Sequence, residues 1–172
     1  MISEGIMNIF KSTAILFTAW ILLSNVSHAA TRIAVLAFEL NDITSLPNTP
    51  QEQQRTASMQ NLLEKALSDY GQYEIIHIDP KEQAKANSSF GYLFNFDDQV
   101  VKLAEEVNAD WVIVGQHSKP SFLFSYLIAH LINVKKQTLK ARYAIELKGT
   151  DIKVSERGVK SLAKKINESI YK

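Results

Sequence analysis

Two short segments of the chain, residues 32–40 and 111–115, carry apolar side chains at both odd and even positions. A strand with this pattern has no face suited to water, which is typical of a parallel sheet covered by helices on both sides. We therefore expect both segments to be central strands of an α/β sheet and to lie side by side.

The polar segment after the first of these strands leads into a well-marked helix. Thr49 suits the N-cap, Pro50 suits the first helical position, and Glu52 completes a capping box three residues after Thr49. Apolar residues then recur at spacings of three and four as far as Tyr70. The pattern predicts a helix with one buried stripe.

A short strand over residues 73–78 follows this helix, and a second helix over about 97–108 precedes the strand at 111–115. Strand–helix–strand crossovers within one sheet are almost always right-handed. The pattern therefore predicts parallel strands, with the strand at 32–40 between the other two.

Residues 121–132 and 138–148 predict an antiparallel hairpin. The second arm alternates between apolar and charged residues, whereas the first arm is apolar on both faces, so the turn decides which of its faces joins the core. A three-residue turn pairs Val134 with Thr138 and places the aromatic face of the first arm on the lysine side; a two-residue turn reverses this. That aromatic face consists of Phe122, Phe124, Tyr126 and Ile128.

A last helix is expected over residues 155–170. The whole pattern predicts a single α/β domain over residues 30–172, with elements in the order βαβαβββα. Its five strands form a mixed sheet in the order 2-1-3-4-5, and the helices pack on it.

The first 29 residues have the pattern of a signal peptide. Lys11 precedes a twelve-residue apolar core, and Ser27 and Ala29 are small residues at the spacing that signal peptidase needs. We expect cleavage after Ala29 and export to the periplasm, with no membrane span afterwards. An uncleaved anchor is the alternative, but twelve apolar residues are few for a hydrocarbon core of ~30 Å.

Composition and charge narrow the function classes. The sequence contains no cysteine, so it offers no disulfide, thiolate ligand, cysteine nucleophile or lipid-bearing cysteine. The net charge is +1, but residues 30–134 carry 7 basic and 13 acidic side chains and residues 135–172 carry 11 and 4. This basic lobe suits an acidic partner, an anionic surface or self-contact, or is simply solvated. Aromatic residues do not interleave with it, so we expect no nucleic-acid binding.

Three segments together carry a resemblance to known proteins. They are the opening strand at 32–40, the strand Ala-Asp-Trp-Val-Ile-Val-Gly at 109–115, and the hairpin introduced by Lys119 and Ser121. They resemble an uncharacterised family of secreted bacterial proteins whose module is similar to the amino-terminal domain of TolB and to the CsgG and LpoB envelope proteins. The resemblance implies envelope assembly or partner binding, and no catalytic residue. The chain departs from the family pattern at the hairpin turn, where Lys136-Gln137 replace Thr-Gly.

Candidate ligands for a small molecule or metal ion lie at the carboxyl ends of the predicted parallel strands, where open α/β sheets bind ligands. Glu39 and Asp42 follow the first strand, His77 and Asp79 end the second, and His117 follows the third. Imidazole and carboxylate groups can hold Zn²⁺ or another divalent ion with an open position. One interpretation is thus a small-ligand or divalent-metal-binding protein, extending to a hydrolase, with His77, Asp79 and His117 as metal ligands; ordinary capping or solvated side chains are the alternative.

The interpretation we favour is a non-catalytic periplasmic accessory or partner-binding module of the cell envelope, docking a protein or an anionic surface. The expected binding residues lie on the first hairpin arm and on a basic stripe of the last helix: Phe122, Phe124, Tyr126, Arg157, Lys160 and Lys164. The aromatic residues form a docking patch if helices leave them uncovered, and core if the last helix covers them. The sequence contains no nucleophile elbow and no phosphate-binding glycine loop. We expect no catalytic residue and no cofactor, and a homo-oligomer is a further alternative.

Overall fold

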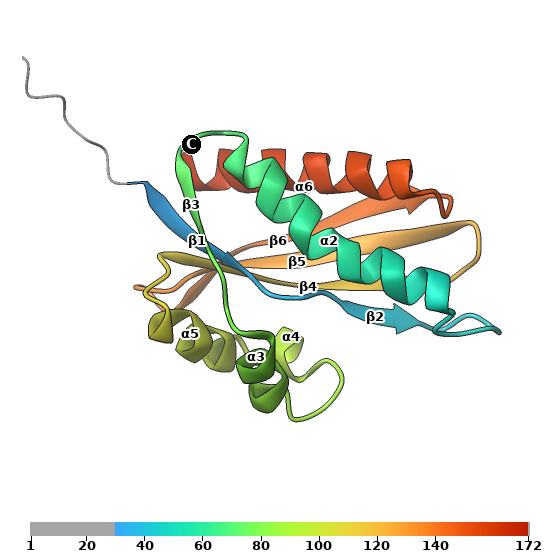
Figure 1. Ribbon diagram of the computed structural model, residues 1–172, viewed down its shortest axis with the longest axis horizontal. Helices are drawn as coiled ribbons and strands as arrows, with labels where there is room; N and C mark the ends of the chain where they lie inside the picture. Colours follow the sequence, from blue (N-terminus) through green and yellow to red (C-terminus); the bar gives the residue numbers. More distant parts are fainter. Residues whose placement is uncertain (1–29, 172) are drawn as a thin grey trace, which may run out of the picture.

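Helices cover both faces of a mixed β-sheet in the computed structural model, which describes residues 30–171 (Figure 1). The predicted signal peptide, residues 1–29, lies outside the described residues. The strands are β1 (Thr31–Val35), β2 (Glu39–Asp42), β3 (Tyr73–Ile76), β4 (Trp111–Lys119), β5 (Phe124–Asn133) and β6 (Thr138–Lys148). The helices are α2 (Pro50–Ser68), α3 (Pro80–Ala86), α4 (Tyr92–Asn95), α5 (Asp97–Glu106) and α6 (Ile152–Tyr171).

The strand order is β3-β1-β4-β5-β6, and β2 pairs with the second half of β4. β1 lies parallel to both β3 and β4, whereas β4, β5 and β6 are antiparallel neighbours. The predicted fold class and sheet order are therefore confirmed, and the two doubly apolar segments do lie side by side. The strand count differs, because the first predicted strand is split into β1 and β2.

The break between β1 and β2 is held by contacts from two other elements. The side chain of Gln83 on α3 bonds the backbone of Ala37, accepting from its N–H at 3.0 Å and donating to its carbonyl at 3.1 Å. The ring of Phe38 lies on Gly115 of β4, where an added Cβ would stand 2.7 Å from Phe38 Cδ1. Gln83 thus satisfies the backbone polar groups of Ala37, and the Phe38 ring fills the space beside β4, at the point where the strand is interrupted between β1 and β2.

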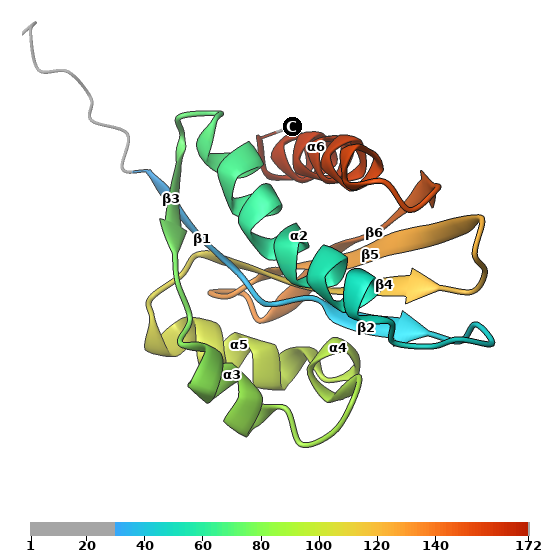
Figure 2. The ribbon, with the colours of Figure 1, turned by 45° about the vertical axis from the view of Figure 1, so that its right-hand side comes forward.

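Each face of the sheet has its own hydrophobic core (Figure 2). α2 and α6 cover one face, while α3, α4 and α5 cover part of the other. Ile33 and Ala34 are neighbours in β1, are both fully buried, and belong to opposite cores. The expectation that this strand is apolar because both of its faces are covered is confirmed.

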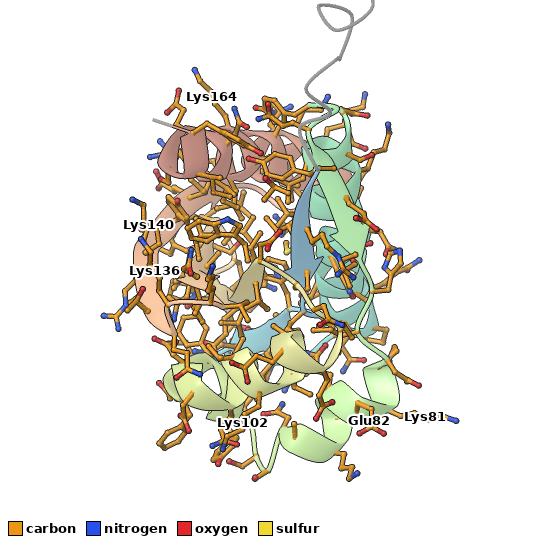
Figure 3. The ribbon with its side chains drawn as sticks, turned by 90° about the vertical axis from the view of Figure 1, so that its left-hand side faces the viewer. Lys81, Glu82, Lys102, Lys136, Lys140 and Lys164 are labelled. Carbon is orange, nitrogen blue, oxygen red and sulfur yellow. The ribbon has the colours of Figure 1, made fainter. Side chains whose placement is uncertain are left out.

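The hairpin combines a four-residue turn with a β-bulge. Asn133 pairs with Thr138, and the register then shifts between Leu131 and Ile132. The shift turns Leu139 toward the α5 side and restores, over most of the hairpin, the register expected from a three-residue turn: Phe124 lies opposite Lys148. β6 forms the margin of the sheet, with Lys140 pointing outward (Figure 3).

Candidate functional site

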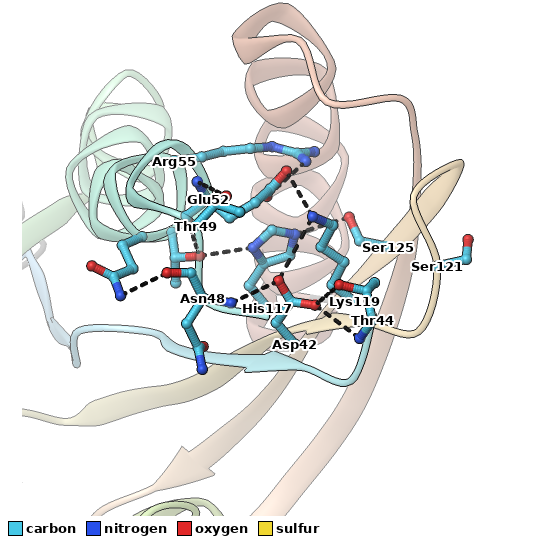
Figure 4. A network of polar contacts seen from close by, with 12 residues as sticks. Asp42, Thr44, Asn48, Thr49, Glu52, Arg55, His117, Lys119, Ser121 and Ser125 are labelled. Carbon is cyan, nitrogen blue, oxygen red and sulfur yellow. Dashed lines mark hydrogen bonds and ion pairs between the residues drawn. The ribbon is translucent and has the colours of Figure 1, made fainter. Parts of the chain in front are cut away.

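A cluster of buried polar side chains joins the ends of β2 and β4 to the first turns of α2 and α6 (Figure 4). We call it the Lys119 network. Its members are Asp42, Glu52, Arg55, Thr56, His117, Lys119, Ser125 and Ser155. It lies at the carboxyl ends of parallel strands, the edge that the sequence indicates for a ligand site.

Asp42 shapes the loop between β2 and α2. Its Oδ1 accepts hydrogen bonds from the backbone N–H and the hydroxyl of Thr44, at 3.1 and 2.7 Å, and its Oδ2 accepts from the backbone N–H of Asn48 at 3.1 Å. Burial by itself raises the pKa of Asp42, but these bonds and the charge of Lys119 outweigh it, so the pKa lies below its usual value. Asp42 is therefore a buried anion that fixes the loop.

Lys119, the last residue of β4, provides the cation between two buried carboxylates. Its Nζ lies 3.2 Å from Glu52 Oε1 and 3.7 Å from Asp42 Oδ2. Arg55 Nη1 lies 3.3 Å from Glu52 Oε2, and Arg55 Nε donates to Ser155 Oγ at 2.7 Å. Two cations thus face two anions, and their mutual attraction offsets part of the cost of burying them.

His117 is neutral and hydrogen-bonded at both ring nitrogens. Thr56 Oγ1 donates to the carbonyl of Glu52, so at 2.8 Å it accepts a hydrogen bond from His117 Nδ1. His117 Nε2 then accepts from the hydroxyl of Ser125 at 2.9 Å. Burial lowers the pKa of His117 to about 4, and the nearby cations Arg55 and Lys119 also lower it, against the carboxylates of Glu52 and Asp42. Neither nitrogen has a lone pair directed at open space.

The structure places the three predicted metal ligands in different surroundings. His117 is inside the Lys119 network, His77 is exposed with Nδ1 3.6 Å from Glu64 Oε1, and Asp79 caps α3 by accepting from the backbone N–H of Lys81. Within residues 30–171, no group of three or more His, Cys, Asp or Glu side chains is arranged to hold a metal ion.

Glu39, the other carboxylate expected near this edge, belongs to a separate polar cluster. It accepts hydrogen bonds from Asn87 Nδ2 at 2.7 Å, from the backbone N–H of Gly91 at 2.9 Å and from Gln116 Nε2 at 3.2 Å. These bonds tie the α3–α4 loop to β4. Of the residues predicted at this edge, only Asp42 and His117 share a network.

Sequence reasoning missed Glu52, Arg55 and Lys119 as buried residues, although their spacing contains the signal. Lys119 has the same parity in β4 as Ile113 and His117, which face α2. Glu52 and Arg55 continue the helical stripe of Met59 and Leu63 back into the first turns of α2. The expected capping box is partly present, since Thr49 accepts from the N–H of Glu52 at 3.4 Å, while the Glu52 carboxylate meets the two cations.

The aromatic face of the first hairpin arm lies on the side of the sheet that α6 does not cover. Leu127 and Ala129 face α6, whereas Phe124, Tyr126 and Ile128 lie on the other face and are half-buried. Their partners across β6 are exposed, and the rings of Phe124 and Tyr126 meet edge to face with centroids 5.8 Å apart. Burial of these aromatic residues under the last helix, one of the two interpretations of this face that the sequence offers, is wrong, because α6 covers the opposite face of β5.

Several exposed apolar residues belong to the β2–α2, β4–β5 and β6–α6 connections, which lie at the same end of the molecule, at the right of Figure 1. Two backbone hydrogen bonds hold the loops together: Ile43 N–H to the carbonyl of Lys119, and Gly149 N–H to the carbonyl of Leu123. Leu123 is 79% exposed and Phe122 is 50% exposed. We define this apolar end as Ile43, Leu46, Phe122, Leu123 and Ile152. Large apolar side chains grouped on a surface mark interaction sites.

The basic residues predicted on the last helix point to solvent. Arg157, Lys160 and Lys164 are all exposed on α6, on the side away from the core residues Val159 and Leu162.

None of the helices within residues 30–171 combines the length and the apolar character needed to cross a membrane.

Comparisons with known proteins identify a family and solved structures of similar fold. A family model described as "Protein of unknown function (DUF2380)", DUF3280, matches residues 31–166. No curated protein sequence matches the chain. Lipoprotein GNA1162 from Neisseria meningitidis is similar in structure, with a TM-score of 0.52 and 14% identity over 81% of this chain and 99% of that one.

TolB from Acinetobacter baumannii matches with a TM-score of 0.50 and 13% identity, over 83% of this chain and 28% of TolB. LpoB from E. coli matches with a TM-score of 0.47 and 16% identity, over 67% of this chain and 55% of that one. The chain thus spans about half of the LpoB chain and less than a third of TolB. The TolB and GNA1162 matches confirm the predicted resemblance, and at these identities they show the fold alone.

Proposed function

This chain belongs to the DUF3280 family, and we propose that it is a non-catalytic module of the bacterial cell envelope that binds a partner protein. The proposal includes export to the periplasm after removal of residues 1–29. The sequence pattern of that leader and the fold shared with TolB and lipoprotein GNA1162 support it.

The observation that carries the proposal is the apolar end together with the uncovered aromatic face of the hairpin. Phe122 and Leu123 lead directly into Phe124 and Tyr126, so exposed and half-exposed apolar side chains run from the β4–β5 turn along β5. Aromatic side chains of this kind are enriched at the centres of protein interfaces. The basic residues Arg157, Lys160 and Lys164 suit an acidic region of the partner.

The Lys119 network supports this role by fixing the loops that carry the apolar end. Asp42 holds the β2–α2 loop, Lys119 begins the β4–β5 turn, and Arg55 bonds Ser155 in the first turn of α6. Lys119 Nζ also lies 5.4 Å from the ring centroid of Phe122. A surface held in place before binding loses less conformational entropy when the partner arrives.

Site-specific photo-crosslinking in cells that produce the protein tests the proposal. A benzophenone amino acid is placed at Tyr126 or, as a matched control, at Phe90, which is exposed on the α3–α4 loop. We expect a discrete adduct with one envelope protein from the Tyr126 position and none of that mass from the Phe90 position.

Reversing the charges of Arg157, Lys160 and Lys164 is expected to weaken the Tyr126 adduct. The absence of any discrete protein adduct at Tyr126 contradicts the proposal. An adduct with lipid identifies an anionic membrane surface instead of a protein, and an adduct with a second copy of this chain identifies a homo-oligomer.

A further inference from the structure

The outer edge of β6 is a long strand edge that no described element covers. β6 extends over 11 residues, and among the described strands it pairs with β5 alone. Figure 3 shows it at the margin of the sheet. The outward backbone N–H and C=O groups of such a strand are a template for pairing with another strand, and proteins usually shorten, cover or charge these edges.

The charges on β6 favour an acidic strand. β6 carries the basic residues Lys140, Arg142 and Lys148 and one acidic residue, Glu146, and all four are exposed. Lys140 and Lys164 of α6 lie on the same side of the molecule in Figure 3. A second β6 strand carries the same excess of basic residues, so its charge complements this edge less well than that of an acidic strand.

A groove beside the same edge can receive apolar side chains. A cavity of about 300 Å³ lies between β6 and the first half of α6. Gly158 of α6 faces Ile145 and Leu147 of β6, which allows the helix to lie close to the strand. The cavity is lined by Ile145, Glu146, Lys148, Val154, Arg157, Gly158 and Ser161.

We propose that β6 accepts an extended segment of a partner protein as an added strand, in which acidic and apolar residues alternate. Successive side chains of a strand point to opposite faces. The apolar side chains therefore enter the groove at Ile145 and Val154, and the acidic ones lie on the opposite face beside Arg142, while Lys148 and Glu146 border the groove. The main-chain hydrogen bonds of the added strand supply affinity, and the side chains supply specificity. This inference rests on the proposed docking function and specifies the chemistry of the partner.

Peptide binding to the purified protein, residues 30–172, tests the inference directly. The probe is an acetylated, amidated nine-residue peptide in which Glu and Val alternate. A second peptide has the same side chains but is methylated at every backbone nitrogen, and a third replaces Glu with Lys. We expect saturable binding of the first peptide, with slowed amide hydrogen exchange confined to β6. The methylated peptide is expected to bind at least tenfold more weakly and the Lys peptide more weakly still.

Two triple variants, which change the net charge of the protein by the same amount, distinguish binding at the β6 edge from nonspecific electrostatic attraction. Lys140→Glu/Arg142→Glu/Lys148→Glu is expected to weaken binding at least tenfold. Lys81→Glu/Lys85→Glu/Lys102→Glu changes three exposed residues of α3 and α5, which do not line the groove at β6, and is expected to change binding less than threefold.

Lack of binding of the first peptide, or equal binding of the methylated one, overturns strand addition. Slowed exchange of β6 that depends on protein concentration without peptide also overturns it, because the occupant is then a second copy. A Tyr126 adduct that persists under those results leaves the docking function in place. Peptide binding as expected, without any adduct in cells, contradicts the docking function and leaves the strand acceptor.

Discussion

Lys119 Nζ lies 3.2 Å from Glu52 Oε1, and both side chains are about 95% buried. Asp42, whose side chain is fully buried, lies on the other side of the same ammonium group. A cation between two buried carboxylates is costly to remove, because each carboxylate then lacks its counter-ion while its side chain has little contact with solvent. The positions of the loops at the apolar end therefore depend strongly on the Lys119 side chain.

Replacing Lys119 with Met is expected to lower the free energy of unfolding by about 3–5 kcal/mol, because Asp42 and Glu52 are left unpaired. Chemical denaturation at pH 7 measures the change. Lys102→Met is the control, since its ion pair with Asp98 is exposed and long at 4.0 Å, and its loss is expected to cost less than about 1 kcal/mol. Adding Asp42→Asn to the Lys119 variant should recover part of the loss. A Lys119→Met protein as stable as the parent would mean that the network is not held by this cation.

Stability is expected to fall as the pH drops from about 6.5 to about 4, because the pKa of His117 is about 4 in the folded protein and near 6.5 when the chain is unfolded. The unfolded chain binds more protons over this range, so the contribution of His117 is complete above pH 6.5 and is lost on acidification. The loss from this group is roughly 3 kcal/mol. Denaturation curves at several pH values measure it.

The pH dependence should weaken in His117→Gln, which removes the titrating group but retains hydrogen-bonding atoms. His77→Gln is the control, since His77 is exposed, and it should keep the parent slope. Burial also lowers the pKa of His130, which retains its own contribution in both variants. Identical slopes in the parent and His117→Gln proteins would show that His117 is not held neutral by the fold.

The sheet could be predicted because its signals are local and redundant. Ile33 and Ala34 point to opposite faces and are both apolar, so the strand requires two covered faces in any arrangement. Thr49 and Pro50 mark the start of α2 whatever packs against it. The short connections between these elements leave few ways to order the strands.

The hairpin register and the Lys119 network could not be predicted from apolar periodicity and helix-start signals. The bulge leaves one extra residue in β6 opposite the step from Leu131 to Ile132 in β5, which alternation along the sequence does not reveal. As a result, Leu139 points to the face opposite the one expected. Lys119 and Glu52 are charged, and charged residues are almost never buried unless paired. Their pairing depends on residues 67 positions apart in the sequence.

Gly115→Ala is expected to lower the free energy of unfolding by about 1–3 kcal/mol through overpacking. The added Cβ would lie 2.7 Å from Phe38 Cδ1 and 2.8 Å from the backbone carbonyl oxygen of Ile128, and the carbonyl cannot move without disturbing the β4–β5 ladder. Gly158→Ala is the matched control, because there the added group meets the movable end of the Leu147 side chain and a helical Ala gains about 0.5–1 kcal/mol over Gly. Thermal denaturation of both variants should rank Gly115→Ala clearly lower; an equal effect would argue against close contact at Phe38.

The exposed residues at the tip of the β4–β5 turn should matter for binding and little for folding. Phe122→Ser/Leu123→Ser removes apolar surface of which half at Phe122 and most at Leu123 is already in water, so we expect the free energy of unfolding to fall by about 2 kcal/mol or less, from the buried half of the Phe122 ring and its contact with Lys119. The same double substitution should abolish the photo-adduct formed from position 126, because the apolar end would no longer contact the partner. Phe90→Ser, at a side chain that is 60% exposed on the α3–α4 loop, should leave both stability and the adduct unchanged. An adduct of undiminished yield in the double variant would place the partner on the sheet face alone, away from the turn.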